Sequence, residues 1–289
     1  MLAPIGVTGT TMKLLANNDK DMLNMKALQQ KKLFLLDMDG TMYLDGTLFH
    51  GVLEFLSYVT RIGGRYIFLT NNSSKGVNAY IEKLKTMGIN TGAENFVTSV
   101  HATVLHLQSK QYKSIYAFGT ASFKSQLGEA NLPITDVLTD DIDCLCMGFD
   151  TELTFSKLED ACILLNRGVD YVATNPDWVC PTWYGFVPDC GSISQILCTA
   201  TGRMPQFIGK PEPTMVRLAM EKTGFSTEET VMIGDRLYTD IACGVNAGVS
   251  TIFVLSGEGT MADIEKSQVK PTYIMKDIKE LHEALLRQA

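Results

Sequence analysis

The sequence predicts an α/β protein whose core is a doubly wound parallel sheet. Residues 32–36, 65–69 and 231–233 form short apolar runs with the length and composition of buried parallel strands. Helical spacing follows the first two runs, at residues 51–63 and 77–87. Strand, helix, strand and helix joined by short connections form a parallel sheet with right-handed crossovers. At 289 residues, the chain is long enough for one large domain or two ordinary ones.

The middle of the chain repeats this pattern and is expected to form a second, smaller unit. Strand-like runs at residues 115–119, 145–149 and 171–174 alternate with segments of helical spacing. A block of this length is too long for a loop and needs a small sheet of its own. We therefore expect an inserted α/β unit at residues 99–205, between core segments at residues 31–98 and 206–289.

Residues 1–30 fit neither unit. Their basic residues are interspersed with acids, and they contain no apolar stretch of the kind found in a secretory signal. We expect a disordered N-terminal extension and assign it no function.

The composition excludes several classes of protein. A net charge of −7 argues against binding to nucleic acid or to an anionic membrane, and no apolar stretch approaches the length of a membrane span. The seven cysteines contain no Cys-x-x-Cys pair and lie mostly in apolar runs, which indicates buried thiols in a reducing compartment. The four histidines show no zinc-ligand spacing. We expect a cytoplasmic protein.

The run Asp37-Met38-Asp39-Gly40-Thr41 directly follows the first predicted strand. Open α/β sheets bind their ligands at the carboxyl ends of the strands, and side chains two apart in a strand share a face. Asp37 and Asp39 are therefore expected to converge on one point. Two carboxylates a few Å apart repel by about 4 kcal/mol at an effective dielectric constant near 20, so they need a cation or a shared proton. Alone, Asp-x-Asp-Gly also occurs in calcium loops and plain turns.

Three further segments carry polar groups at the ends of predicted elements. Thr70-Asn71-Asn72-Ser73 ends the second apolar run with hydroxyl and amide groups. Gly209-Lys210-Pro211 places a lysine just before a helix start. Gly234-Asp235 ends a third apolar run and is followed by Thr239-Asp240. In a parallel sheet, these strand ends meet at one edge.

The chemistry of this edge depends on which side chains meet there. If Asp37, Asp39 and Asp235 converge, three carboxylates attract a hard divalent cation, and ligation by oxygen alone suits Mg²⁺. For Lys210 the alternative is a solvated surface lysine. For Asn72 the alternative is a turn amide that caps the next helix.

Taken in this order, the four segments resemble the four motifs of the haloacid dehalogenase (HAD) superfamily of phosphotransferases. The Thr-Asn-Asn form of the second segment and the insert after it are similar to the NagD-like and p-nitrophenylphosphatase-like branch. The resemblance runs from about Lys31 to the C-terminus. It implies a Rossmann-like HAD core with an inserted α/β cap domain, and a phosphatase (a phosphoric monoester hydrolase).

The resemblance also implies roles for single residues. Asp37 would be the nucleophile that forms an aspartyl-phosphate intermediate, and Asp39 the general acid and base. Thr70 and Asn71, together with Asn72, would bind the transferred phosphoryl group.

In the resembled family a lysine and a metal ion complete the site. Lys210 would add a fixed positive charge beside the phosphoryl group. Mg²⁺ would be bound by Asp37, the backbone carbonyl of Asp39 and Asp235, with Asp240 in a supporting position.

Within the resembled superfamily, Asp39, the second aspartate of the first motif, limits the classes of enzyme that this chain can belong to. Dehalogenases lack it and transport ATPases carry threonine there, so Asp39 favours a phosphatase or a phosphomutase. A mutase usually carries a small helical cap, unlike the α/β insert, which leaves a phosphatase. We expect a Mg²⁺-dependent hydrolase of a small phosphorylated metabolite. Sugar phosphates, phosphoglycolate, pyridoxal phosphate and nucleotides stay open, and the alternative is a non-catalytic phosphate-ester-binding or regulatory protein on the same fold.

The cap is expected to select the substrate. Residues 173–177 and 185–192 resemble the cap loops that face the active site in this branch. Trp178, Trp183 and Tyr184 lie between them, either as cap core or as substrate contacts. We expect residues 183–186 to contact the leaving group, and no arginine pair marks a site for a second phosphate. A homodimer formed through the cap is a further expectation.

Overall fold

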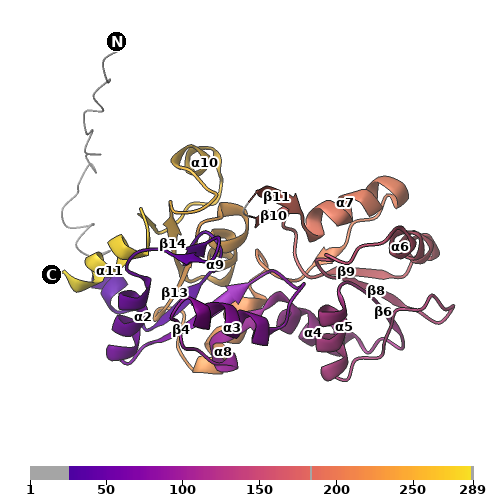
Figure 1. Cartoon of the computed structure of the whole chain (residues 1–289), viewed down its shortest axis with the longest axis horizontal. Helices are drawn as coiled ribbons and strands as arrows, with labels where there is room; N and C mark the ends of the chain where they lie inside the picture. The colour runs from indigo at the N-terminus through magenta and orange to yellow at the C-terminus, as the bar shows by residue number, and fades with distance from the viewer. Residues whose placement is uncertain (1–25, 183, 288–289) are drawn as a thin grey trace, which may run out of the picture.

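The computed structural model describes residues 26–182 and 184–287 and contains two parallel sheets flanked by helices. Figure 1 shows the two units side by side along the long axis of the molecule. The larger unit is the core and the smaller one is the inserted cap. This arrangement confirms the predicted α/β class.

The core sheet has six parallel strands in the order β15-β14-β13-β1-β4-β5. Strand β1 (Leu33–Leu36) lies between β13 (Thr230–Gly234) and β4 (Arg65–Thr70). Its last residue, Leu36, stands opposite Ile233 and Phe68. The three strands therefore end at the same edge, where the predicted site residues follow. The remaining core strands are β5 (Phe96–Thr98), β14 (Ser250–Val254) and β15 (Tyr273–Met275).

Helices cover both faces of this sheet, and successive side chains of β1 point alternately toward the two faces. Phe34 and Leu36 are buried in one apolar cluster, and Leu33 and Leu35 are buried in another. The first cluster includes helices α2 (Val52–Arg61), α3 (Val77–Thr86) and α11 (Ile278–Leu286). The second includes α4 (Ser99–Lys110), α8 (Thr214–Thr223) and α9 (Ala242–Ala247). Shorter helical segments are η1 (Ala93–Asn95), η2 (Leu237–Ile241) and α10 (Met261–Lys266).

The cap has its own five-stranded parallel sheet in the order β12-β9-β8-β6-β7. Its strands are β6 (Ile115–Phe118), β7 (Ile134–Thr135), β8 (Cys144–Met147), β9 (Asp170–Ala173) and β12 (Gln206–Phe207). Its helices are α5 (Ala121–Glu129), α6 (Phe155–Arg167) and α7 (Cys190–Thr201).

The boundaries between the units differ from the predicted ones in two details. Strand β12 pairs with β9, with Phe207 opposite Ala173, so the chain is still in the cap where we expected the core to resume. Helix α4, which we assigned to the cap, packs against α8 and shares one apolar cluster with both sheets. Short apolar segments such as these show that a residue is buried, but not which sheet it joins.

The predicted N-terminal extension also ends earlier than expected. Leu28 is fully buried in the core cluster that contains Phe34 and Val52. Its burial ties the last residues of the 1–30 segment to the core. Residues 1–25 lie outside the described part of the chain.

Two antiparallel hairpins lie outside the sheets. The first consists of β2 (Tyr43–Leu44) and β3 (Thr47–Leu48), and both residues of its turn, Asp45 and Gly46, have positive φ. The second consists of β10 (Val179–Thr182) and β11 (Gly185–Pro188) and belongs to the cap. Figure 1 places it between the two units.

The carboxyl ends of both sheets face the loop that follows β4. Ser73 in this loop bonds through its hydroxyl to Thr174 after β9, at 2.9 Å, and to the backbone N–H of Phe149 after β8, at 2.8 Å. The Thr120 hydroxyl after β6 donates to the Ser74 carbonyl at 2.9 Å. A site at the edge of the core sheet is therefore covered by the loops of the cap sheet.

Two expectations from composition can be compared with the fold. The seven cysteines all lie in the described residues and are all free, four of them buried. Among the described residues, no helix combines the length and apolar character that crossing a membrane would require.

Candidate active site

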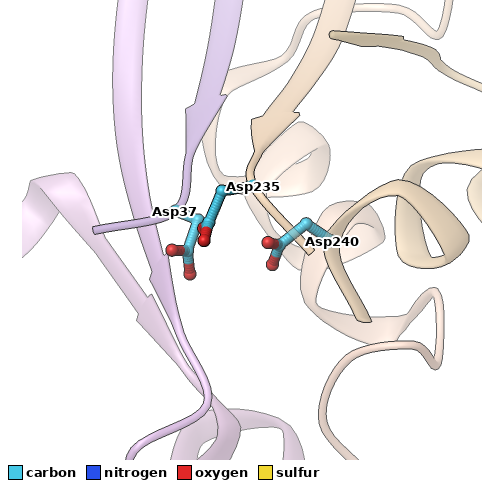
Figure 2. Close-up of side chains that lie close together, drawn as sticks. All are labelled: Asp37, Asp235 and Asp240. Carbon is cyan, nitrogen blue, oxygen red and sulfur yellow. The ribbon is translucent and has the colours of Figure 1, made fainter. Parts of the chain in front are cut away.

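Three carboxylates from separate segments meet at the edge of the core sheet. Asp37 follows β1, Asp235 follows β13, and Asp240 lies in the π-helical segment η2. Each offers an oxygen within 4.8 Å of the others (Figure 2). The Asp37 backbone N–H donates to the Ile233 carbonyl at 2.9 Å, which extends the β1–β13 pairing to Asp37.

The Asp235 carboxylate is fixed by the backbone around it. It accepts hydrogen bonds from the Thr41 hydroxyl at 3.2 Å and from the Glu258 backbone N–H at 2.7 Å. A Cβ atom at Gly40 or Gly257 would collide with this carboxylate. Gly40 also has a φ of 85°, which favours glycine. Both glycines therefore allow the acid to lie against the first motif.

Lys210 is buried among these acids and is not a surface lysine. Only 2% of its side chain is exposed, and its Nζ lies 2.6 Å from Asp37 Oδ1 and 2.7 Å from Asp240 Oδ1. It also donates to the Leu69 carbonyl at 3.2 Å. Burial alone would lower the pKa of Lys210, but Asp240 and Asp37 outweigh that effect and raise it. The ammonium group is therefore held in its charged form.

One ammonium does not balance three carboxylates. Burial and the charge of Asp240 raise the pKa of Asp37 well above its usual range, although Lys210 opposes the shift. The same two causes raise the pKa of Asp235 to about 6. When ionised, the three carboxylates exceed the one ammonium in charge. They offer oxygen ligands only, a donor set that fits Mg²⁺.

The second motif is only partly free to bind a phosphoryl group. Thr70 is buried and its Oγ1 accepts from the Asn72 backbone N–H at 3.2 Å. The Asn71 amide already donates to Asp177 Oδ2 at 2.7 Å and to the Lys210 carbonyl at 3.0 Å, and its Oδ1 accepts from the Lys210 N–H at 2.9 Å. Both hydrogens of the Asn71 side-chain amide are used within the protein, so a phosphoryl contact from this side chain would have to replace one of these bonds.

Asn72 forms a turn amide instead of a helix cap. Its Oδ1 accepts from the Ser74 backbone N–H at 3.0 Å and from the Ser74 hydroxyl at 2.7 Å. The next helix, α3, begins after Gly76 with no side-chain cap. Asn72 nevertheless borders the cavity described below.

The Asp39 carboxylate lies apart from the three-carboxylate cluster. It accepts from the Tyr43 hydroxyl at 3.2 Å and pairs with the Lys83 ammonium at 3.3 Å. Strand β1 ends at Leu36, so the alternation used to predict convergence does not extend to Asp39. Asp37 and Asp39 still border one cavity, which leaves space for a substrate between them.

A cavity of about 50 Å³ joins the core residues to the cap. Asp37, Lys210 and Asp240 border it from the core. The cap residues that border it are Asp177, Val179, Cys180, Pro181 and Asp189. The predicted cap loops at residues 173–177 and 185–192 therefore each contribute an acid to this cavity.

Residues 183–186 are predicted to contact the leaving group, and the described ones among them, 184–186, do not border this cavity. Tyr184 and Phe186 are 63% and 61% exposed and do not border the cavity, whereas β10 does. The hairpin borders the cavity through Val179, Cys180 and Pro181 of strand β10. Trp178 is half exposed, and Trp183 lies outside the described residues.

Arg236 is a site residue that sequence reasoning missed. Its Nη1 lies 2.7 Å from Asp177 Oδ1 in the cap, and its Nε lies 2.8 Å from Glu258 Oε2. Burial alone would lower the pKa of Arg236, but Asp177 and Glu258 raise it. The available signal was its position directly after Asp235, where a charged side chain emerges at a strand end.

A larger hollow lies away from these acids. Helices α3, α4, α5 and α8 border a space of about 1110 Å³ that is mostly apolar. None of the three clustered carboxylates borders it. Asp37 and Asp240 of that cluster border the smaller cavity at the strand ends instead.

Comparison with known proteins identifies the family. The sequence model of the haloacid dehalogenase-like hydrolases matches residues 34–133, and a HAD-hydrolase-like model matches residues 207–281. An acid sugar phosphatase of Staphylococcus aureus is 36% identical over 254 residues, which is 88% of this chain and 97% of that protein. The chain belongs to the haloacid dehalogenase superfamily.

Solved structures narrow this HAD protein to one branch. A 4-nitrophenylphosphatase from Thermotoga maritima is 41% identical, with a TM-score of 0.84 over 90% of this chain and 99% of that one. A putative nagD protein is 39% identical, with a TM-score of 0.81 over 89% and 98% of the two chains. These likenesses confirm the NagD-like and p-nitrophenylphosphatase-like branch, and the HAD protein described here is a phosphatase.

A related structure was solved with metal ions. A glycerol phosphate phosphatase from Mycobacterium tuberculosis, 29% identical with a TM-score of 0.82, was solved in complex with magnesium and with calcium. The match to the magnesium complex covers 89% of this chain and 78% of that one. In the chain described here, Asp37, Asp235 and Asp240 form a group of oxygen donors that could hold a metal ion.

Asp189 in the cap should make stability depend on pH. Burial, and then the charge of Asp177, raises the pKa of Asp189 to about 7. The unfolded value is near 3.9, so the folded protein binds more protons between about pH 4 and pH 7. This proton stabilises the fold at low pH, and the stabilisation is lost as the pH rises to 7.

We expect Asp189→Asn to remove this dependence. Asp189 Oδ1 accepts both hydrogen bonds, from the Cys190 N–H at 2.5 Å and the Asn175 amide at 3.1 Å, so an amide can keep them. Its free energy of unfolding, relative to wild type, should rise by on the order of 3 kcal/mol between pH 5 and pH 8. Denaturant titration at both pH values measures this. The exposed Asp140→Asn is the control, and an equal effect of Asp189→Asn at both pH values would contradict the assignment.

Proposed function

We propose that this phosphatase hydrolyses small phosphomonoesters through an aspartyl-phosphate intermediate on Asp37, with Mg²⁺ as cofactor. The observation that carries the proposal is the Asp37 carboxylate at the edge of the sheet, paired with a buried ammonium 2.6 Å away. A nucleophile of this kind needs its own charge offset before it can approach a phosphate dianion. Lys210 supplies part of that positive charge.

The reaction needs two carboxylates with different tasks. An Asp37 oxygen attacks phosphorus, the bond from phosphorus to the leaving oxygen breaks, and Asp39 gives that oxygen a proton. Asp39 then takes a proton from a water molecule that attacks the phosphoryl group, and Asp37 is released. Tyr43 and Lys83 hold the Asp39 carboxylate at the rim of the cavity, which supports this role.

A metal ion completes the charge balance. Asp37 and Asp235 are the carboxylates proposed to bind Mg²⁺, together with the Asp39 carbonyl. Asp240 already accepts from Lys210 through Oδ1 and from the Arg236 N–H through Oδ2, which supports a role in positioning instead of ligation. When bound, Mg²⁺ screens the negative charge of the carboxylate and of the phosphate.

A non-catalytic phosphate-binding protein is the weaker interpretation. Acids whose pKa values are raised by burial and by mutual repulsion destabilise a fold, and they are concentrated at catalytic sites. A protein that only bound phosphate esters would have no need for a second carboxylate, Asp39, beside Asp37. The intact set of acids with Lys210 supports turnover.

The charges around the cavity support an ester with a neutral leaving group. Both cations are already paired, Lys210 with Asp37 and Asp240, and Arg236 with Asp177. They face five acids, namely Asp37, Asp39, Asp177, Asp189 and Asp240. An additional carboxylate or phosphate on the leaving group would find no unpaired cation among these residues. We therefore propose sugar or polyol phosphates, in line with the names of the acid sugar phosphatase and glycerol phosphate phosphatase relatives.

Asp37→Asn should abolish turnover and keep the fold. The amide cannot attack phosphorus, but it matches the carboxylate in shape and relieves the repulsion from Asp240. We expect a loss of at least about 100-fold in kcat, or about 2.7 kcal/mol. Release of p-nitrophenol from p-nitrophenyl phosphate measures kcat, and thermal denaturation checks the fold. A folded variant that kept more activity would rule out Asp37 as the nucleophile.

Activity should depend on Mg²⁺. We expect a chelator to abolish hydrolysis and added Mg²⁺ to restore it, whereas Zn²⁺ should substitute poorly at a site with only oxygen ligands. Isothermal titration of the metal-free protein with Mg²⁺ gives a second readout, and Asp235→Asn should weaken this binding. Full activity in metal-free buffer would contradict the proposed cofactor.

The neutral-leaving-group proposal predicts a substrate order. Glycerol phosphate and sugar monophosphates should have kcat/KM values at least about 10-fold above that of 2-phosphoglycolate, because the phosphoglycolate carboxylate would lie among acids whose cations are already paired. Phosphate release should be compared at one ionic strength and one Mg²⁺ concentration. A preference for 2-phosphoglycolate would show that a cation near the cavity is available to the substrate.

A further inference from the structure

Five residues around the cavity form a closed ring of hydrogen bonds. Four of them belong to the core, namely Asn71, Lys210, Asp240 and Arg236, and the fifth, Asp177, belongs to the cap. We propose that Asp177 is a positioning residue that fixes Lys210 and Asp240 from the cap. This inference rests on the proposed roles of Asp37 and Lys210.

One half of the ring runs from the cap to the lysine. Asp177 Oδ2 accepts from the Asn71 amide at 2.7 Å. The same Asn71 side chain bonds both backbone groups of Lys210, accepting from its N–H at 2.9 Å and donating to its carbonyl at 3.0 Å. The Lys210 ammonium then reaches Asp37 Oδ1 at 2.6 Å. A shift of Asp177 therefore moves the backbone that carries the lysine.

The other half runs through the arginine. Asp177 Oδ1 accepts from Arg236 Nη1 at 2.7 Å, and the Arg236 backbone N–H donates to Asp240 Oδ2 at 3.1 Å. Asp240 Oδ1 accepts from Lys210 Nζ at 2.7 Å, which closes the ring. The ring contains two carboxylates, two cationic side chains and the neutral Asn71, so its charges balance.

Burial makes this ring a fixed arrangement. Asp177, Lys210 and Asp240 are at most 2% exposed, and Asn71 is 7% exposed. Hydrogen bonds between ionised groups that are shielded from water are about twice as strong as neutral ones. The contacts at Asp177 are also long-range, since Asn71 lies 106 residues away in the sequence and Arg236 lies 59 away. The cap thereby controls where the catalytic ammonium sits.

Asp177→Asn breaks the ring with a minimal change of shape. The two carboxylate oxygens accept from donors on opposite sides, Arg236 on one and the Asn71 and Asn175 amides on the other. An amide has one acceptor oxygen, so its NH₂ group must face one of these donors. Either orientation breaks one of the two bonds that join Asp177 to the core, the bond to Asn71 or the bond to Arg236.

The test separates positioning from simple destabilisation. With p-nitrophenyl phosphate and saturating Mg²⁺, Asp177→Asn should lower kcat by at least about 10-fold and change KM by less than about threefold. The matched control is Asp150→Asn, a buried cap acid paired with Lys157 at 2.7 Å that does not border the cavity. It should lower the thermal midpoint while kcat stays within about twofold of wild type.

A double-mutant cycle tests whether the ring acts as a unit. Arg236→Gln removes the side-chain donor of the Asp177–Arg236 bond and keeps the backbone N–H that bonds Asp240. Because both substitutions act on the same ring, the double variant Asp177→Asn/Arg236→Gln should be about as slow as the slower single variant. If the double variant lost kcat by the product of the two single-variant factors, the proposal would be overturned. So would a wild-type kcat in Asp177→Asn, or an equal kcat loss in Asp150→Asn. If wild type is active and Asp37→Asn inactive, such results reject the positioning role and leave the proposed function standing.

Discussion

The structure depends on an imbalance of charge at the edge of the core sheet. Three acids lie within 4.8 Å of one another, and one buried ammonium bonds two of them. Such an arrangement persists only if the surrounding backbone over-determines it. The pairing of β1 with β13, the glycines around Asp235 and the hydrogen bonds of Asn71 to Lys210 supply that constraint. The raised pKa values of Asp37 and Asp235 are the cost of keeping these groups together.

The cap contributes to this constraint as well as covering it. The loop after β4 bonds the loops that follow β6, β8 and β9, and Asp177 reaches the same loop and Arg236. The cap therefore has two tasks, although Asp177 also borders the cavity. Val179, Cys180 and Pro181 border the space for a substrate, while Asp177 bonds the core. A substitution in β10 and one at Asp177 should consequently affect different kinetic constants.

The sequence predicted the parts of the site that are encoded locally. Asp37 and Asp235 directly follow strong apolar runs, and Lys210 lies between a glycine and a proline before a helix. The partners of Asn71 lie 106 and 139 residues away, and no local pattern announces them. The strand alternation used for Asp39 does not reach it, because β1 ends three residues earlier, at Leu36. Arg236 was overlooked because a charged residue after a strand end is usually solvated, and only the fold brings Asp177 to it.

The sharing of helix α4 between the two units has a consequence for how the protein unfolds. Val100 and Leu107 of α4 lie in one apolar cluster with Met215 of the core and with Cys144 of the cap sheet. Removing the insert would expose this cluster to water, so the core has no complete interior without it. Denaturation should therefore proceed as one cooperative transition. Neither unit should persist as an independently folded fragment.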